Sequence, residues 1–323
     1  RSPYFPVLWG WWFTASDLVE QTRRSEVLIR DVGPEAERES RLQALHCGWA
    51  TLFDGGAHGR CLSAIDEGLA LYDPEEGRRA RRLYGHDAKV CGLGERALSG
   101  WLTGQLDRSA QAIAECEAWG DETAHLGSVL HGLDIATQVA VFLQYLAEID
   151  RLLSKVEALS GAEAAPFLAA KRQIFRGWIA ARRGDSGQYE AVMAGLADLR
   201  RFGVLEDTPF YADIAADIAA AHGAGDGALG ALEEEIAASR ETGLLYWQPQ
   251  LLRRKAVLLG GGAAAEAALD EGLEIAQDQG AHMLSLLNLC TRLDQGLALP
   301  RADWVDQVSE CRQKTLILNA LGR

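Results

Sequence analysis

The chain lacks the features that mark β-sheet and membrane-spanning proteins. No segment of its 323 residues alternates apolar and polar side chains as a half-buried strand would, and aromatic residues make up only 7%. No apolar run reaches the roughly 18 residues that a membrane span needs. The apolar opening Pro6–Phe13 is too short to span and lacks the layout of a secretory signal. These absences leave helix as the main structural class.

Cysteine is scarce and shows no pairing pattern. The six cysteines form no CxxC, and each falls inside an apolar helical pattern. We therefore expect small core residues in a reducing compartment, which predicts a cytoplasmic protein without metal or disulfide. The residues are Cys47, Cys61, Cys91, Cys116, Cys290 and Cys311.

Positive charge is also in short supply. Lysine occurs only five times, and the formal net charge is −14. Phosphate binding needs a basic surface, so we expect no direct contact with nucleic acid. Two short basic clusters, Arg78–Arg82 and Arg253–Lys255, are predicted to be solvated helix faces, as is the acidic run Glu233–Glu235.

What the chain does have is a repeating helical pattern rich in alanine and leucine, with 48% hydrophobic residues and 34 glycines. The stretch Ala265–Leu293 shows the unit: a helix with an apolar stripe, a stop at Gly280, and a second helix. Glycines at predicted helix ends recur 41, 42, 40 and 37 residues apart, at Gly120, Gly161, Gly203, Gly243 and Gly280. A period of this size is typical of a solenoid.

A second glycine series marks the tight turn inside each helix pair. It comprises Gly56, Gly104, Gly184, Gly225 and Gly261, with Gln144-Tyr145 at the position where one glycine is missing. Two interleaved series indicate two helices per repeat. We therefore predict an all-α chain, an α-solenoid of about eight antiparallel helix pairs, forming one continuous array over residues 1–323. Since the first residue is arginine, we expect a piece of a longer or processed protein.

The predicted pairs follow one another with short connections, and the longest polar connection is the linker Glu75–Gly85. Ser16 is the predicted N-cap of the second helix. The helices are Tyr4–Ala15 with Asp17–Asp31, Glu35–Phe53 with Ala57–Tyr72, His86–Thr103 with Leu106–Trp119, Thr123–Leu143 with Leu146–Leu159, Glu163–Arg183 with Ser186–Phe202, Pro209–His222 with Gly227–Thr242, Leu245–Leu259 with Ala263–Gln279, and Ala281–Leu299 with Asp303–Leu321.

Several segments resemble a known family. The stretch LYDPEEGRRARRLYGHDAKVC at Leu71–Cys91, with its Leu-Tyr-Asp-Pro and Tyr-Gly-x-Asp elements, is similar to tetratricopeptide (TPR) repeats of bacterial multidomain signalling ATPases. Phe5–Gly10, Leu245–Leu259 and Ala265–Leu293 add to the match. Such proteins include class III adenylate cyclase–ATPase–TPR proteins and ATPase-linked transcription regulators. The period near 40 exceeds the usual 34, so HEAT-like repeats remain the structural alternative.

No catalytic motif accompanies the repeats. The sequence has no GxxxxGK[ST], HExxH or GxSxG, and its seven histidines are scattered singly. We therefore expect a non-catalytic chain without cofactor, in which the resemblance implies that an ATPase or cyclase domain elsewhere does the chemistry. A stand-alone enzyme is the least favoured hypothesis.

The resemblance implies a concave face, lined by the first helix of each pair, that binds a protein or peptide segment. Lys171, Trp178 and Arg182 share one helix face, and two cations beside an aromatic could hold a peptide carboxylate. The alternative is that Trp178 packs in the core with the charges solvated, and that His46 is an ordinary helix histidine. The candidates are Gln43, His46, Trp101, Lys171, Trp178, Arg182, Gln250 and Arg253, together with Phe53.

Two functions follow as hypotheses. The first is a sensor or scaffold of a cyclase-linked signalling ATPase that binds a protein or peptide, its own upstream effector domain among the candidates. The second is a ligand-sensing domain of a transcription regulator with a small molecule in the groove. Trp9, Trp11 and Trp12 form either an N-terminal core or a surface for a neighbouring domain. No membrane partner is expected.

Overall fold

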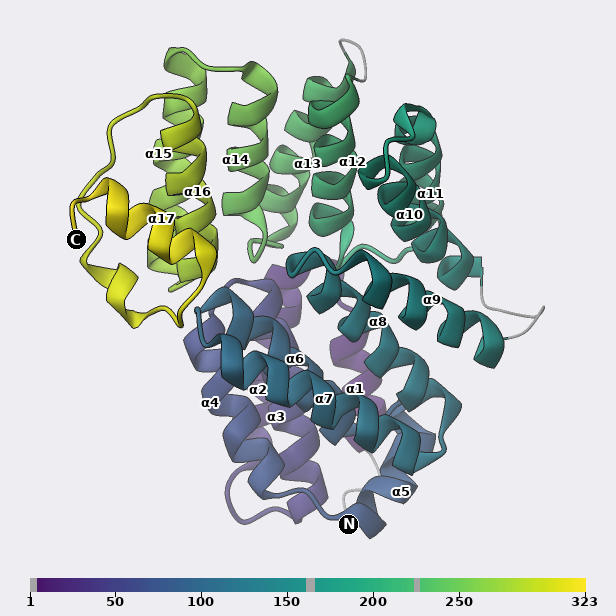
Figure 1. The fold of residues 1–323 in the computed structure, drawn as a ribbon. Helices are drawn as coiled ribbons and strands as arrows, with labels where there is room; N and C mark the ends of the chain where they lie inside the picture. The colour runs from purple at the N-terminus through teal and green to yellow at the C-terminus, as the bar shows by residue number, and fades with distance from the viewer. Residues whose placement is uncertain (1–4, 161–165, 224–226) are drawn as a thin grey trace. The chain divides into compact units, whose positions relative to one another are not determined.

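The computed structural model describes residues 5–160, 166–223 and 227–323, and this part of the chain is all-helical. Its 17 α-helices pack mostly in sequential pairs, for example α3 on α4 and α14 on α15, as expected for a helical repeat (Figure 1). The predicted all-α class is confirmed. Within the described residues, no helix is long and apolar enough to cross a membrane.

The contacts divide the chain into two compact units, Arg1–Glu148 and Ile149–Arg323, here called the first and second unit. The single continuous array stays a prediction. The helices of the first unit are α1 Phe5–Phe13, α2 Leu18–Val32, α3 Arg38–Asp54, α4 His58–Ala70, α5 Pro74–Tyr84, α6 Ala88–Leu102, α7 Leu106–Thr123 and α8 Leu126–Phe142.

The boundary between the units falls within α9 (Leu146–Ser160). In the second unit α10, α12, α14 and α16 are the first helices of successive pairs, and each contacts the next (Figure 1). The second unit contains α10 Pro166–Arg182, α11 Tyr189–Arg201, α12 Thr208–His222, α13 Gly227–Thr242, α14 Gln248–Leu259, α15 Ala263–Asp278, α16 His282–Asp294 and α17 Arg312–Ala320, with short 3₁₀ segments at Ser186–Gln188 and Asp303–Gln307.

The turns follow the two glycine series closely. Positive φ angles of 65–122° occur at the described members of both series except Gly120. Gln144, which stands where a glycine is missing, also takes a positive φ of 56°. The helix end predicted at Gly120 is wrong, because α7 continues one turn further and Ala124 takes the left-handed conformation instead. Gly161 and Gly225 lie outside the described residues.

The predicted linker Glu75–Gly85 is also wrong, because it forms helix α5. Asp73 caps this helix by accepting hydrogen bonds from the backbone N–H groups of Glu75 and Glu76, and Pro74 occupies its first turn. Gly85 then ends it with a left-handed φ of 83°. An Asp-Pro start, acidic residues in the first turn and a glycine stop are ordinary helix signals. They were hidden by a sequence too polar to show an apolar stripe.

Two further boundaries differ from expectation. Asp17, not Ser16, caps α2, because its carboxylate accepts the backbone N–H of Glu20 at 2.9 Å. The last predicted helix, Asp303–Leu321, is broken into a 3₁₀ segment and the shorter α17, and α16 ends at Asp294. Residues 161–165 and 224–226, which include predicted helix and turn ends, lie outside the described residues.

The N-terminal tryptophans belong largely to the core of the first unit. Trp12 is buried beside Leu28 and Cys47, and its indole N–H donates to Thr51 Oγ1 at 3.0 Å. Trp9 and Trp11 are partly buried against the same cluster. Val7 and Phe13 of α1 are exposed. Core packing is therefore the main role of these rings within this unit.

Asp87 organises the segment that carries the Tyr-Asp-Pro and Tyr-Gly-x-Asp elements. Its fully buried carboxylate accepts hydrogen bonds from the Tyr72 hydroxyl at 2.8 Å and the Trp119 indole at 3.2 Å, and it caps the N–H of Lys89. Tyr72 lies so close to α5 that a Cβ on Gly77 would be 2.5 Å from its hydroxyl oxygen. These bonds attach the segment between α4 and α5 to the start of α6 and to α7.

We expect Tyr72→Phe to lower the free energy of unfolding by about 1.5–3 kcal/mol, since it deletes a hydrogen bond to a buried carboxylate. Urea unfolding of the full chain followed by circular dichroism measures this change. The exposed Tyr145 provides the control, and Tyr145→Phe should change stability by less than about 0.5 kcal/mol. Equal stability of the two variants would contradict this role of Asp87.

Candidate binding face on the first helices of the second unit

A chain of polar contacts crosses the first helices of the second unit. It centres on Asp213 and Asp217, which lie four residues apart and therefore on one face of α12. Both carboxylates accept hydrogen bonds from neighbouring first helices. The donors to Asp217 come from α10 and α14. The donors to Asp213 come from α14 and from Trp247, the residue that precedes α14. The resulting network ties three successive repeats together.

Asp213 is bound from the α14 side. The Trp247 indole N–H donates to Oδ2 at 3.3 Å, the Gln250 amide to the same oxygen at 3.1 Å, and Arg254 Nε to Oδ1 at 2.8 Å. The carboxylate is buried, and so are all three donors. Burying a carboxylate is costly unless hydrogen-bond donors satisfy it in this way.

Asp217 joins α10 to α14. The Trp178 indole N–H donates to Oδ2 at 2.8 Å, Arg254 approaches Oδ1 at 2.8 Å, and Arg182 lies 3.8 Å from Oδ2. Burial raises the pKa of this carboxyl, but Arg254, the indole and Arg182 outweigh burial and hold the pKa below its usual value. Arg254 thus bridges both aspartates, each of which accepts one of its N–H groups.

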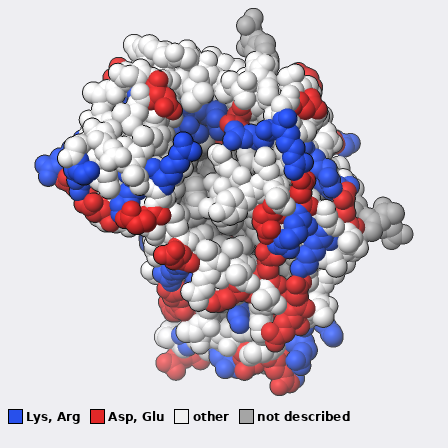
Figure 2. Space-filling model, viewed as in Figure 1, with Lys and Arg blue, Asp and Glu red and all other residues white. Residues whose placement is uncertain are grey.

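Three arginines lie at this face. Arg254 contacts both aspartates, and Arg182 lies near Asp217. Arg253 is half-buried and bonds to neutral groups, Gln250 Oε1 at 2.8 Å and Thr291 Oγ1 at 3.0 Å. Burial, and then the adjacent Arg254 cation, lower the pKa of Arg253 to about 10. Basic atoms gather over α10, α12 and α14 in Figure 2.

The structure buries most of the predicted site residues of this unit. Trp178 is only 3% exposed, so its ring is core packing with one polar contact, which was the alternative reading. Lys171 is buried and pairs with Asp207 at 2.9 Å. Gln250 is buried in the network, Arg253 is half-buried, and the Arg182 side chain is 38% exposed.

Two interpretations of charged clusters are wrong. Arg254 is buried between two aspartates, so Arg253–Lys255 is not simply a solvated face. Glu235 is also buried, where it pairs with Arg200 and accepts a hydrogen bond from Thr208 at 2.9 Å. Arg78, Arg79 and Arg82 are exposed as expected.

The candidates in the first unit are likewise buried. Trp101 packs against Phe142 with ring centroids 4.7 Å apart, and Phe53 packs against His58. The amide oxygen of Gln43 accepts a hydrogen bond from His46 Nδ1 at 3.1 Å. His46 is 2% exposed, and its Nε2 lies 3.3 Å from Nε2 of His86. The ring centroids of His86 and His131 are 4.2 Å apart.

The histidines are therefore scattered in sequence but grouped in space. Burial, and then His86, lower the pKa of His46 well below its usual value. Burial, and then His131 and His125, do the same for His86. Both rings are neutral near pH 7. Sequence reasoning missed this group because its members are tens of residues apart.

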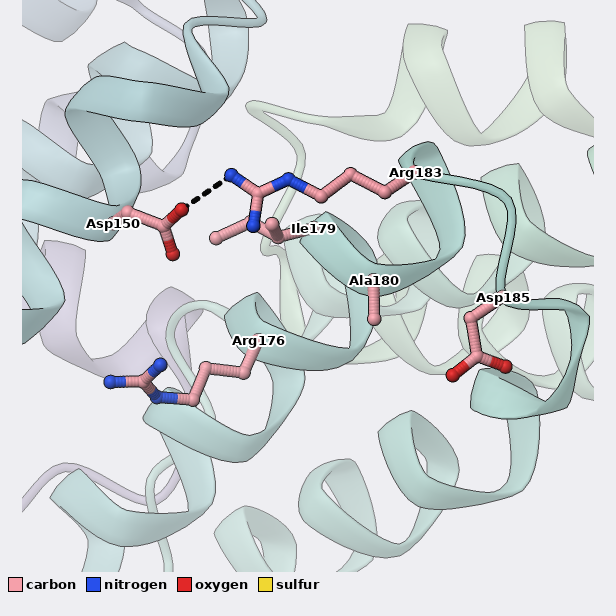
Figure 3. Close-up of a pocket in the computed structure, with 6 residues that line it drawn as sticks. All are labelled: Asp150, Arg176, Ile179, Ala180, Arg183 and Asp185. Atoms are coloured by element: carbon pink, nitrogen blue, oxygen red, sulfur yellow. Dashed lines mark hydrogen bonds and ion pairs between the residues drawn. The ribbon is translucent and has the colours of Figure 1, made fainter.

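Two surface pockets lie in the second unit. The larger, of about 320 Å³, is lined by α9, α10 and the start of the 3₁₀ segment, and Figure 3 shows Asp150 paired with Arg183 across it. Asp185 caps the following turn, and Arg176 pairs with Glu157. The charged side chains that line this larger pocket therefore already have partners. The smaller pocket, of about 220 Å³, lies beside Arg182 and Asp217.

These features define the class of protein only coarsely: an all-helical chain built from sequential helix pairs, consistent with a helical repeat. No family model matches the chain. The chain is 33% identical over 291 residues to an uncharacterized protein, R02095, of Rhizobium meliloti (strain 1021). The match covers 88% of this chain but only 28% of that relative, so the chain spans less than a third of its length.

We expect Asp217→Ala to lower the free energy of unfolding by about 3 kcal/mol, because it leaves the buried Trp178 indole and part of Arg254 without their acceptor. Chemical denaturation of the full chain measures the loss. The matched control is Asp198→Ala, since Asp198 pairs with Arg201 on the exposed side of α11 and should contribute about 0–1 kcal/mol. Similar losses in the two variants would count against a structural role for the network.

Proposed function

We propose that the chain is a non-catalytic binding module, a TPR-like α-solenoid within a longer bacterial signalling protein. Three observations support this proposal. The helices pack in sequential pairs, the related protein is more than three times as long as the matched region, and the Leu71–Cys91 segment resembles TPR repeats of signalling ATPases. In this proposal the module is cytoplasmic, and catalysis belongs to an ATPase or effector domain elsewhere in the parent protein.

The ligand we propose is a protein or peptide segment that presents a carboxylate to the first helices of the second unit. The observation that carries this is Arg253, a half-buried cation whose hydrogen bonds within the described part of the chain go to the neutral side chains of Gln250 and Thr291. A carboxylate arriving at Arg253, beside Arg182, would form charge-assisted hydrogen bonds in place of bonds to neutral groups. Trp178 positions Asp217 beneath this surface and does not itself contact the ligand.

A small-molecule sensor of a transcription regulator is the second candidate. The pocket that favours it lies between α10 and α12, beside Arg182 and Asp217. Its volume of about 220 Å³ is below the roughly 300–1,000 Å³ of typical ligand pockets. An extended segment lying across several helices therefore fits this face better than an enclosed metabolite does.

Selection of random peptides displayed on phage against the full chain tests the proposal. We expect the selected peptides to share an Asp, a Glu or a C-terminal carboxylate. By fluorescence anisotropy, Arg253→Gln should weaken a selected peptide by at least about tenfold, because truncating a partly desolvated charge pair costs about 2 kcal/mol or more. Added salt should weaken binding further.

Arg201→Gln serves as the control, since Arg201 is an exposed arginine of α11, a second helix. It should leave the affinity unchanged. Selected peptides without any shared carboxylate, or equal affinities for wild type and Arg253→Gln, would refute the proposed ligand class. Failure to select any peptide, together with thermal stabilisation by small metabolites, would favour the sensor instead.

A further inference from the structure

Three potential metal ligands meet in the first unit although His46 is 40 residues from His86 in the sequence. His46 lies on α3, His86 lies two residues before the start of α6, and Cys91 lies in the first turn of α6. One ligand atom of each, the two imidazole nitrogens and the thiol sulfur, lies within 4.8 Å of the others. His46 and Cys91 are buried, and His86 is half-buried. The cluster is separate from the binding face proposed above.

The spacing of the two imidazoles matches a shared tetrahedral ion. His46 Nε2 and His86 Nε2 are 3.3 Å apart. Two nitrogens bound to one zinc ion at about 2.0–2.1 Å, with a tetrahedral angle between them, are also roughly 3.3–3.4 Å apart. The same distance is long for a hydrogen bond between two ring nitrogens. The pair therefore has the geometry of two ligands as well as that of a weak contact.

A hydrogen bond to Gln43 orients the His46 ring so that its unprotonated Nε2 faces the other two ligands. Its Nδ1 lies 3.1 Å from the amide oxygen of Gln43, which can only accept, so Nδ1 carries the proton and Nε2 keeps its lone pair toward His86. Gln43 is fixed in turn by Glu39, whose carboxylate accepts its amide N–H at 2.9 Å. Metal-binding histidines are oriented in the same way, by an acceptor on the second ring nitrogen.

His86 is also held in place. The carboxylate of the next residue, Asp87, accepts hydrogen bonds from Tyr72 and Trp119. The backbone N–H of Asp87 donates to Ser128 Oγ at 2.9 Å. The ring of His131 packs on that of His86 from α8. Since Cys91 is one helical turn into α6, the same short segment positions two of the three ligands.

We propose that His46, His86 and Cys91 bind one zinc ion, with a water molecule in the fourth position. Two imidazoles and a thiolate suit a borderline-soft divalent ion, whereas magnesium and calcium prefer oxygen ligands. Binding displaces the thiol proton of Cys91 to solvent, and His46 keeps its Nδ1 proton on the amide oxygen of Gln43. The ion joins α3 to the start of α6, two helices that belong to successive repeats.

Cobalt(II) substitution tests the site directly. The purified full chain is stripped with a chelator under reducing conditions and titrated with Co²⁺ and then with Zn²⁺. We expect one Co²⁺ per chain, tetrahedral visible bands, a thiolate-to-cobalt charge-transfer band, and loss of all bands when one equivalent of Zn²⁺ is added. The thermal midpoint of the stripped chain should rise when zinc is restored.

Variants separate the ligands from their surroundings. Cys91→Ser should abolish the charge-transfer band, and His86→Gln should abolish tetrahedral binding, with circular dichroism confirming that both variants are folded. Gln43→Ala should weaken zinc binding by about 10–100-fold, the usual effect of removing an orienting partner. The control is Cys116→Ser, which removes another buried thiol of this unit and should leave the spectrum unchanged.

A wild-type chain that binds no cobalt or zinc while folded would overturn the proposal and leave His46 and His86 as a neutral imidazole pair. A charge-transfer band that persists in Cys91→Ser would overturn it as well. Peptide binding at Arg253 in the second unit is measured independently, so each proposal can fail without the other.

Discussion

The second unit depends on two carboxylates that neighbouring repeats share, the buried Asp213 and the half-buried Asp217. Together they bind Trp178 from α10, Trp247 just before α14, and Arg254 on α14. Withdrawing carboxylates and a guanidinium from water is costly unless their donors and acceptors are paired. The network meets this demand only when α10, α12 and α14 have one particular register. Its physical role is therefore to select that register. The adjacent Arg253, which bonds to neutral groups, is the part at which we propose a ligand binds.

The sequence predicts the helix pairs well because its glycines mark places where only a left-handed backbone makes the turn. Gly104, Gly184, Gly261 and Gly280 all have positive φ, and Gln144 adopts the same conformation without glycine. Helix α5 was missed because it is short and polar and shows no apolar stripe. The burial of Trp178 and Arg254 was missed because periodicity on one helix says nothing about what the next helix brings to that face.

One sequence signal could have found both sites. Partners across first helices are separated by about one repeat: Trp178 and Asp217 by 39 residues, Asp213 and Arg254 by 41, and Arg253 and Thr291 by 38. His46 and His86 are 40 residues apart. Stacked repeats bring equivalent positions together, so the glycine period also predicts which polar residues meet. Searching for ligands three or four residues apart, as on a single helix, cannot find such pairs.

Hydrogen exchange on Arg254→Met tests most directly whether the shared carboxylates hold the first helices together. This variant keeps the length and apolar stem of the side chain but leaves Asp213 and Asp217 without their common cation. We expect amide protection in α10, α12 and α14 to fall together, with α3 and α6 of the first unit unchanged, because the three helices then lose the same partner. Loss of protection confined to α14 would contradict this and show that each repeat is held independently of the network.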